Sequence, residues 1–230
     1  MNPTTEPTIL ALDAAGNACS VTLWAAGEVV ARRWESMARG HAEALMPMAE
    51  AVVADRGFAA IDRVAVSVGP GAYTGLRIAV SAARGLGLAL GVPVQGIGSF
   101  GVHRRIARDG DVAGPLAVVL ETKRSDFYLQ IFGIDDAALT DPAVLDTDEV
   151  ARALREHSIE TVVGDAADRL AAEIPGAGLL AMCAQEADAA IVAALAAGLP
   201  APADAPPPRP MYLRPPDTSP PGADRQRLRG

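Results

Sequence analysis

The chain has 230 residues and half of them are hydrophobic, which is enough for one large globular domain or two of about 100 to 120 residues. Its net charge of −8 and its aromatic content of 4% disfavour a protein that binds nucleic acids by itself. The two cysteines, Cys19 and Cys183, form no C-x-x-C pair, which suits a reducing compartment. The N-terminal MNPTTEPT has no basic region and no long apolar core, so the sequence predicts a cytoplasmic protein.

The first part of the chain predicts a strand meander followed by alternating helices and strands. Turns separate the three expected strands, at 8–13, 18–24 and 28–34. Apolar residues at helical spacing predict a helix at 40–56, which Pro47 bends or starts late. The remaining elements are a strand at 63–68, a helix from 74 to 91, a strand at 93–97 and a helix at 99–107 capped by Ser99.

The turn at Gly69-Pro70-Gly71 joins an apolar strand to a helix, an arrangement that often binds anions. However, no Lys-Ser/Thr follows these glycines, as a Walker A loop requires. Thr74 also stands where the dinucleotide fingerprint needs its third glycine. We therefore interpret the segment as a tight turn with Thr74 as the N-cap of the helix.

The helix after this turn is rich in small residues, among them Ser81 and Gly85, although each helical glycine costs about 1 kcal/mol relative to alanine. Small residues four apart allow a second helix to approach closely. Arg77 and Arg84 interrupt the apolar run, so it does not predict a membrane span. Two interpretations remain open: a core helix packed on a sheet, or a helix whose outer side packs on a helix of a partner.

The second part of the chain repeats this pattern more weakly. The expected elements are strands at 116–120 and 127–134, a helix at 147–156, a strand at 160–163 and helices at 165–173 and 186–197. A polar, turn-rich segment places a boundary near residue 110, between a first lobe at 1–110 and a second at 111–198. Prolines dominate residues 199–230, which we interpret as an extended tail with one anchored island at Met211-Tyr212-Leu213.

Two lobes that each open with a meander resemble the duplicated ribonuclease-H-like fold of actin, Hsp70 and sugar kinases (the ASKHA type). We predict an α/β protein of two such lobes with β-β-β-α-β-α order in each. In that fold a nucleotide lies between the lobes, held by turns that pair an acid with a glycine. The equivalent positions are Asp13, Gly16, Glu121 and Gly164. The second turn lacks its glycine and the adenosine loop keeps only one, which predicts a vestigial cleft without tight ATP binding.

No other pattern predicts a catalytic centre. His41, His103 and His157 lie far apart, and no helix carries two of them at a metal-binding spacing. The sequence has no G-x-S-x-G elbow. We therefore expect neither catalytic residues nor a bound metal, and we interpret His103 and His157 as structural or surface residues. His41 opens the first helix, where it can contact a partner.

Five segments resemble the bacterial TsaB (YeaZ) family. They are ILALD at 9–13, ACSVTLW at 18–24, HAEALMP at 41–47, VGPGAYTGLRI at 68–78 and YLR at 212–214. The GPGAYTGLR core is specific in this setting, and the resemblance covers about residues 8–105 well. In the second lobe it depends on strand order and the terminal YLR. The family usually carries D-A-R-x-x-E-V-Y where this chain has ETKRSDFY at 121–128, which weakens a nucleotide role for that lobe.

The resemblance implies a non-catalytic subunit in the formation of threonylcarbamoyladenosine at position 37 of tRNAs that read codons beginning with A. In the family TsaB is the inactive paralogue of the transferase TsaD, and the ATPase TsaE joins them. The chain is thus expected to bind TsaD-like and TsaE-like proteins, to form a homodimer when alone, and to reach tRNA only through the complex. No membrane and no intrinsic cofactor are implied; ATP and Mg are expected at the level of the complex.

The implied contact face lies on the first-lobe helices at 40–55 and 74–90. Its expected residues are His41, Leu45, Met48, Val52, Tyr73, Thr74, Arg77, Ile78, Ser81 and Gly85. Two rival functions stay open. An ATP-using phosphotransferase of the same fold would depend on Asp13 and a metal, and a peptidase of the M22-like type would need metal ligands or a nucleophile.

Overall fold

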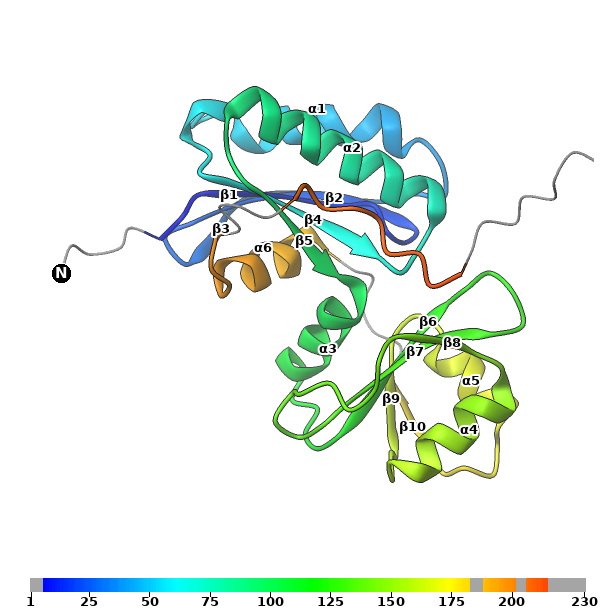
Figure 1. The fold of residues 1–230 in the computed structure, drawn as a ribbon. Helices are drawn as coiled ribbons and strands as arrows, with labels where there is room; N and C mark the ends of the chain where they lie inside the picture. The colour runs from blue at the N-terminus through cyan, green and yellow to red at the C-terminus, as the bar shows by residue number, and fades with distance from the viewer. Residues whose placement is uncertain (1–5, 183–187, 202–205, 215–230) are drawn as a thin grey trace, which may run out of the picture.

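The computed structural model describes residues 6–182, 188–201 and 206–214, which form two five-stranded sheets flanked by helices (Figure 1). The first lobe comprises β1 (Ile9–Asp13), β2 (Ala18–Ala25), β3 (Glu28–Ser36), α1 (His41–Val53), a 3₁₀ turn (Phe58–Ala60), β4 (Arg63–Gly69), α2 (Tyr73–Leu90), β5 (Val94–Gly98) and α3 (Ser99–Asp109). The remaining elements are β6 (Leu116–Glu121), β7 (Phe127–Phe132), β8 (Ala143–Leu145), α4 (Thr147–Glu156), β9 (Thr161–Val163), α5 (Ala167–Glu173), β10 (Leu180–Met182) and α6 (Ala189–Ala197). None of the helices in the described ranges is long and apolar enough to cross a membrane.

The two sheets have the same topology. In the first, with order β3-β2-β1-β4-β5, the meander β1 to β3 is antiparallel, and β4 and β5 run parallel to β1. The second, read as β8-β7-β6-β9-β10, repeats these directions strand for strand. The predicted class of two ribonuclease-H-like lobes is therefore confirmed. The strands β8 and β10, each of three residues, were not predicted from the sequence.

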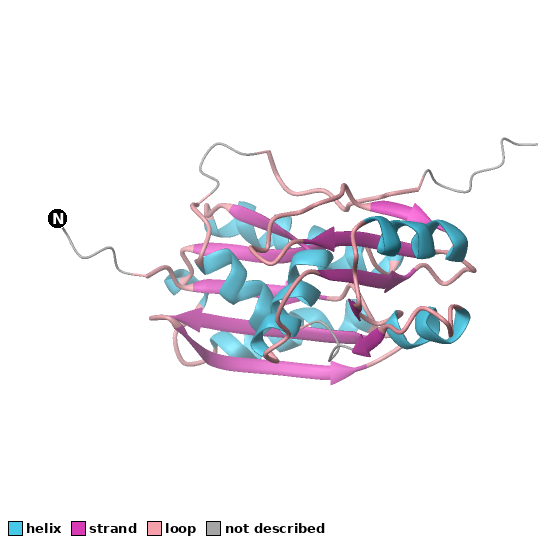
Figure 2. Ribbon diagram, turned by 90° about the horizontal axis from the view of Figure 1, so that it is seen from below, coloured by secondary structure: helices cyan, strands magenta, loops and turns pink. Residues whose placement is uncertain are grey.

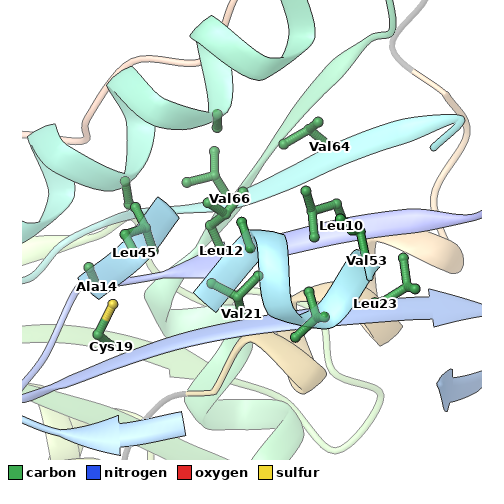
Figure 3. Packing of buried hydrophobic residues seen from close by; sticks show 14 of the residues in the cluster. Leu10, Leu12, Ala14, Cys19, Val21, Leu23, Leu45, Val53, Val64 and Val66 are labelled. Carbon is green, nitrogen blue, oxygen red and sulfur yellow. The ribbon is translucent and has the colours of Figure 1, made fainter. Parts of the chain in front are cut away.

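Helices cover both faces of the first sheet (Figures 1 and 2). On one face α1 and α2 bury an aliphatic core that includes Leu12, Val21 and Val66 (Figure 3). On the other face α3 and α6 pack against the opposite side of β1 and β4. Sequence order grouped α6 with the second lobe, but the helix packs on the first. Its apolar residues pack against Ile9 and Ala11 of β1. The buried Arg63 guanidinium also donates to the Ala196 carbonyl at 2.8 Å.

Two predicted helix caps are wrong. Ala72, not Thr74, is the N-cap of α2, and Thr74 lies exposed in the first turn. The helix starts there because the Ala72 amide is fixed by a 2.7 Å hydrogen bond to the Ala15 carbonyl. Gly98, not Ser99, precedes α3, whose N-cap makes no side-chain hydrogen bond. In α1, Pro47 lies in the middle of a helix that is continuous from His41 to Val53.

Residues 206–214 form an extended segment that runs from the first sheet toward the second lobe (Figure 1). The Met211 amide donates to the Val68 carbonyl at 2.7 Å, beside the end of β4. Leu213 then packs against the core of the second lobe. The predicted anchored island in the proline-rich tail is confirmed by these contacts.

Candidate functional site

Beside the β1–β2 turn, where a nucleotide would lie in this fold, the two lobes pack closely against each other. A cavity of about 30 Å³ remains there, and both lobes contribute to its walls. Its lining residues are Ala15, Gly16, Pro70, Gly71, Ser99, His103, Leu120, Glu121 and Asp165. Sites for cofactors and small ligands usually occupy about 300 to 1,000 Å³. This cavity is therefore too small to hold a nucleotide with its metal.

Next to this cavity, the turn between β1 and β2 lies against the beginning of α2. A Cβ atom added at Gly71 would lie 2.4 Å from the Ala15 carbonyl oxygen, and one at Gly75 would lie 1.9 Å from that of Ala14. These glycines thus serve close backbone packing. The Ala15 carbonyl also accepts a hydrogen bond from the Ala72 amide, so a backbone oxygen of the chain itself occupies the positive N-terminal end of α2. This supports the tight-turn interpretation over a phosphate site.

The Asp13 carboxylate accepts hydrogen bonds only from residues of its own lobe among the described residues. The residue is 2% exposed and does not line the cavity. Its oxygens accept hydrogen bonds from the Ala15 amide at 2.8 Å and from the Ser67 hydroxyl at 2.5 Å. Burial raises the pKa of Asp13, and the two hydrogen bonds offset part of this effect. The acid expected to handle a metal is therefore a structural group that holds the β1–β2 turn.

The two predicted residues of the second lobe are also used structurally. The Glu121 carboxylate lines the cavity but pairs with Arg169 at 2.7 Å. Gly164 has a φ of +121° and lies so close to β6 that a Cβ atom would be 2.2 Å from the Val119 carbonyl oxygen. Of the four predicted cleft residues, the cavity therefore brings together only Gly16 and Glu121.

Three cavity residues, Ser99, His103 and Asp165, were not predicted as a group. Ser99 and His103 are four apart on α3, a spacing that places both on one helix face and could have suggested a pair. Burial lowers the pKa of His103, with Asp165 opposing the shift, so the imidazole is neutral near pH 7. The Ser99 hydroxyl and His103 Nδ1 are buried and have no hydrogen-bond partner in the described part of the chain. A serine nucleophile is activated by a hydrogen bond to its histidine, and Ser99 and His103 do not form one in the described part of the chain. The cavity of about 30 Å³ is also too small for a peptide substrate.

Across residues 6–182, 188–201 and 206–214, no three His, Cys, Asp or Glu side chains gather as a metal-binding set.

The face formed by α1 and α2 is open to solvent and carries most of the predicted contact residues. Tyr73 is 49% exposed, and Thr74, Arg77, Ser81 and Gly85 are exposed along the same side of α2. His41, Met48 and Ile78 are partly exposed.

Two predicted contact residues, Leu45 and Val52, are not on this face. They are 1% and 3% exposed and belong to the core between α1 and the sheet, so they cannot touch a partner. The apolar stripe of α1 packs inward, whereas Glu43 and Glu50 lie on its exposed side.

The structure also clarifies the small-sided helix. One side of α2, with Leu76, Ala79 and Ala83, is buried on the sheet. On the opposite side, a Cβ atom added at Gly85 would meet no other atom within 4 Å. A hollow of about 800 Å³ lies at the C-terminal end of this side, next to Leu88, which is 87% exposed. The inner side of α2 is therefore part of the core, as the first interpretation predicted. That its outer side packs on a helix of a partner stays a prediction.

Comparisons with known proteins agree on one family. The sequence matches the family model described as TsaD, tRNA N6-adenosine threonylcarbamoyltransferase, over residues 32–203. It is 38% identical over 94 residues to the tRNA threonylcarbamoyladenosine biosynthesis protein TsaB of Escherichia coli K12, covering 40% of each chain. Among solved structures, a Pseudomonas aeruginosa protein described as similar to peptidase YEAZ has a TM-score of 0.76 at 25% identity, covering 90% of this chain and 100% of its own. YeaZ from Pseudomonas aeruginosa has a TM-score of 0.69 at 26% identity, covering 84% and 91%.

The sequence alignments are partial. They span 40%, 52% and 55% of the length of the curated TsaB proteins of Escherichia coli, Haemophilus influenzae and Bacillus subtilis.

Proposed function

The chain belongs to the TsaB (YeaZ) family, and from this premise we propose that it is a non-catalytic scaffold subunit in the biosynthesis of tRNA N6-threonylcarbamoyladenosine. In this role it binds a TsaD-like transferase, which a TsaE-like ATPase joins, and the complex modifies the adenosine at tRNA position 37. The chain reaches tRNA only through its partners, which agrees with its net charge of −8. ATP and Mg act at the level of the complex.

One contrast carries this proposal: the cavity beside the β1–β2 turn is small, whereas the outer face of α1 and α2 is exposed to solvent. The 30 Å³ cavity is smaller than a nucleotide, and the Asp13 carboxylate is hydrogen-bonded within its own lobe, which supports a role without nucleotide chemistry. On α2, Ser81 and Gly85 lie one turn apart and exposed, so a helix of another subunit can approach the backbone closely. The proposed contact residues are His41, Met48, Tyr73, Thr74, Arg77, Ile78, Ser81 and Gly85.

Size-exclusion chromatography with light scattering tests the proposal, using this chain and the TsaD-like protein of the same organism. We expect a stable one-to-one complex in place of the homodimer. Gly85→Arg should abolish the complex without unfolding the chain, because the new side chain points into open space. Gly101→Arg is the matched control: it also changes a helical glycine with open space around it, but on α3, on the other side of the first sheet.

Two outcomes would contradict the proposal. Normal assembly of Gly85→Arg and Ser81→Arg would place the partner elsewhere on the molecule. A chain that ignores the TsaD-like protein but binds ATP by calorimetry would favour the phosphotransferase alternative. Reconstituted threonylcarbamoyladenosine formation, measured with and without the chain, connects the physical complex to the reaction.

A further inference from the structure

Three side chains on the exposed side of α2 form a compact cluster of two tyrosines and an arginine. The Arg77 guanidinium carbon lies 3.8 Å from the ring centroid of Tyr73 and 5.7 Å from that of Tyr212, which comes from the C-terminal segment. The two ring centroids are 5.5 Å apart, and Arg77 Nε donates to the Tyr212 hydroxyl at 2.7 Å. Nearly half of each tyrosine is exposed, at 49% and 46%. Such a surface cluster combines the residue types that most often dominate protein interfaces.

Contacts on both sides of Tyr212 fix its position. Before it, the Met211 amide is bonded to the end of β4, and Pro208 lies against Gly96 of β5. After it, Leu213 packs on the second lobe and Arg214 forms an ion pair with Asp126. The tyrosine is therefore held by both lobes before any partner arrives. Side chains that are ordered in advance lose less conformational entropy on binding.

Arg77 differs from several other arginines of the chain in having no carboxylate partner. Arg32, Arg108 and Arg169 each form an ion pair with an acidic residue. Although the chain is acidic overall, no carboxylate of the described residues pairs with Arg77. Tyr212 accepts from Nε, and Tyr73 also hydrogen-bonds to the guanidinium, so the exposed remainder of the group is left for a carboxylate of another protein. A guanidinium held in this way keeps its charge and can donate a charge-assisted hydrogen bond to a carboxylate.

We propose that Tyr73, Arg77 and Tyr212 anchor the docking surface of α2, and that the partner protein places an Asp or Glu carboxylate against Arg77. The inference rests on the proposed function, since the partner is the TsaD-like subunit. It extends the docking surface from the first-lobe helices to the C-terminal segment. A protein fits better than a nucleic acid, because one cation on a chain of charge −8 is too little for a phosphate backbone. The small residue Ser81, one turn along the same side, leaves room for a partner helix.

Isothermal titration calorimetry of the full chain with the TsaD-like protein, at low and at high salt, tests this assignment. Arg77→Gln should weaken binding about tenfold or more and flatten its salt dependence, because it removes the charge. Tyr212→Ala should weaken binding by a similar factor. Tyr212→Phe keeps the ring and loses only the hydroxyl that holds Arg77, so a loss of about threefold is expected. Arg209→Gln is the control: it removes an exposed charge of the same segment outside the cluster.

The outcomes separate this inference from the proposed function. If wild type binds and Arg77→Gln binds equally well with the same salt dependence, the anchor is wrong and the scaffold function stands. A wild-type chain that fails to bind the TsaD-like protein overturns both. Variants that weaken only the homodimer would assign the cluster to a second copy and overturn the choice of partner. Arg77→Gln and Tyr212→Phe should melt at the wild-type temperature, so a loss of folding cannot mimic the expected result.

Discussion

Replacing Gly75 by alanine tests the close packing of the β1–β2 turn on α2. The new Cβ atom would lie 1.9 Å from the Ala14 carbonyl oxygen, whereas ordinary contacts begin at 3.4 Å, so the β1–β2 turn and α2 must separate by up to 1.5 Å. The turn resists this movement because Asp13 and Ala72 bond to Ala15 from either side. Overpacking of this kind costs about 1 to 3 kcal/mol, and more when backbone must shift.

We expect Gly75→Ala to lower the free energy of unfolding by about 3 kcal/mol, which for a chain of this length lowers Tm by about 6 to 12 °C. Gly85→Ala, on the same helix, should do the opposite. No atom lies within 4 Å of its Cβ position, so only the higher helix propensity of alanine remains, worth about 0.5 to 1 kcal/mol. Thermal and urea unfolding followed by circular dichroism measure both variants. A Gly75→Ala variant with the stability of wild type would refute the close packing of the turn on α2.

Three further predictions address other parts of the chain. Burial raises the pKa of Asp13, so its proton stabilises the fold fully below the unfolded value of about 3.9, and this contribution is lost as the pH rises through the folded pKa. Asp13→Asn should therefore be at least as stable as wild type at pH 7, and its free energy of unfolding in urea should no longer show this pH dependence. The variant should still bind the TsaD-like protein, and a loss of binding would contradict a structural role for Asp13. Burial, with Asp13 and Glu35 adding to it, raises the pKa of the Cys19 thiol to about 11, so mass spectrometry of alkylated peptides should find this cysteine modified only after unfolding. Asp146→Ala removes the capping box of α4 and should lower Tm by about 2 to 4 °C, with no effect on partner binding.

The rival functions make different demands on the same residues. A phosphotransferase would require the Asp13 carboxylate in an open cleft, but the carboxylate is bonded to Ser67 and Ala15 behind a 30 Å³ cavity. A hydrolase built on Ser99 and His103 would require contact between them, and the Ser99 hydroxyl makes no hydrogen bond in the described part of the chain.

Local patterns in the sequence were sufficient to predict the two lobes and most of their elements. Strands such as 9–13 and the helix at 147–156 follow from the spacing of apolar residues and from capping residues, which act over a few positions. The same local reasoning found the Gly69-Pro70-Gly71 turn and its likeness to one family. It failed where a cap depended on a distant partner, as at Ala72, whose amide bonds to the turn after β1.

Only the tertiary structure decided which sides of these elements meet. Leu45 and Val52 are as apolar as an interface residue, and their burial on the sheet became clear only when α1 was placed on it. Similarly, α6 follows the second lobe in sequence but packs on the first sheet, where its apolar residues contact Ile9 and Ala11 of β1. Tyr212 reaches Arg77 across 135 positions of the chain, a contact that no local pattern encodes. The sequence by itself thus determined the elements and their order, whereas long-range packing decided that the cavity beside the β1–β2 turn is small and that the outer side of α2 is exposed.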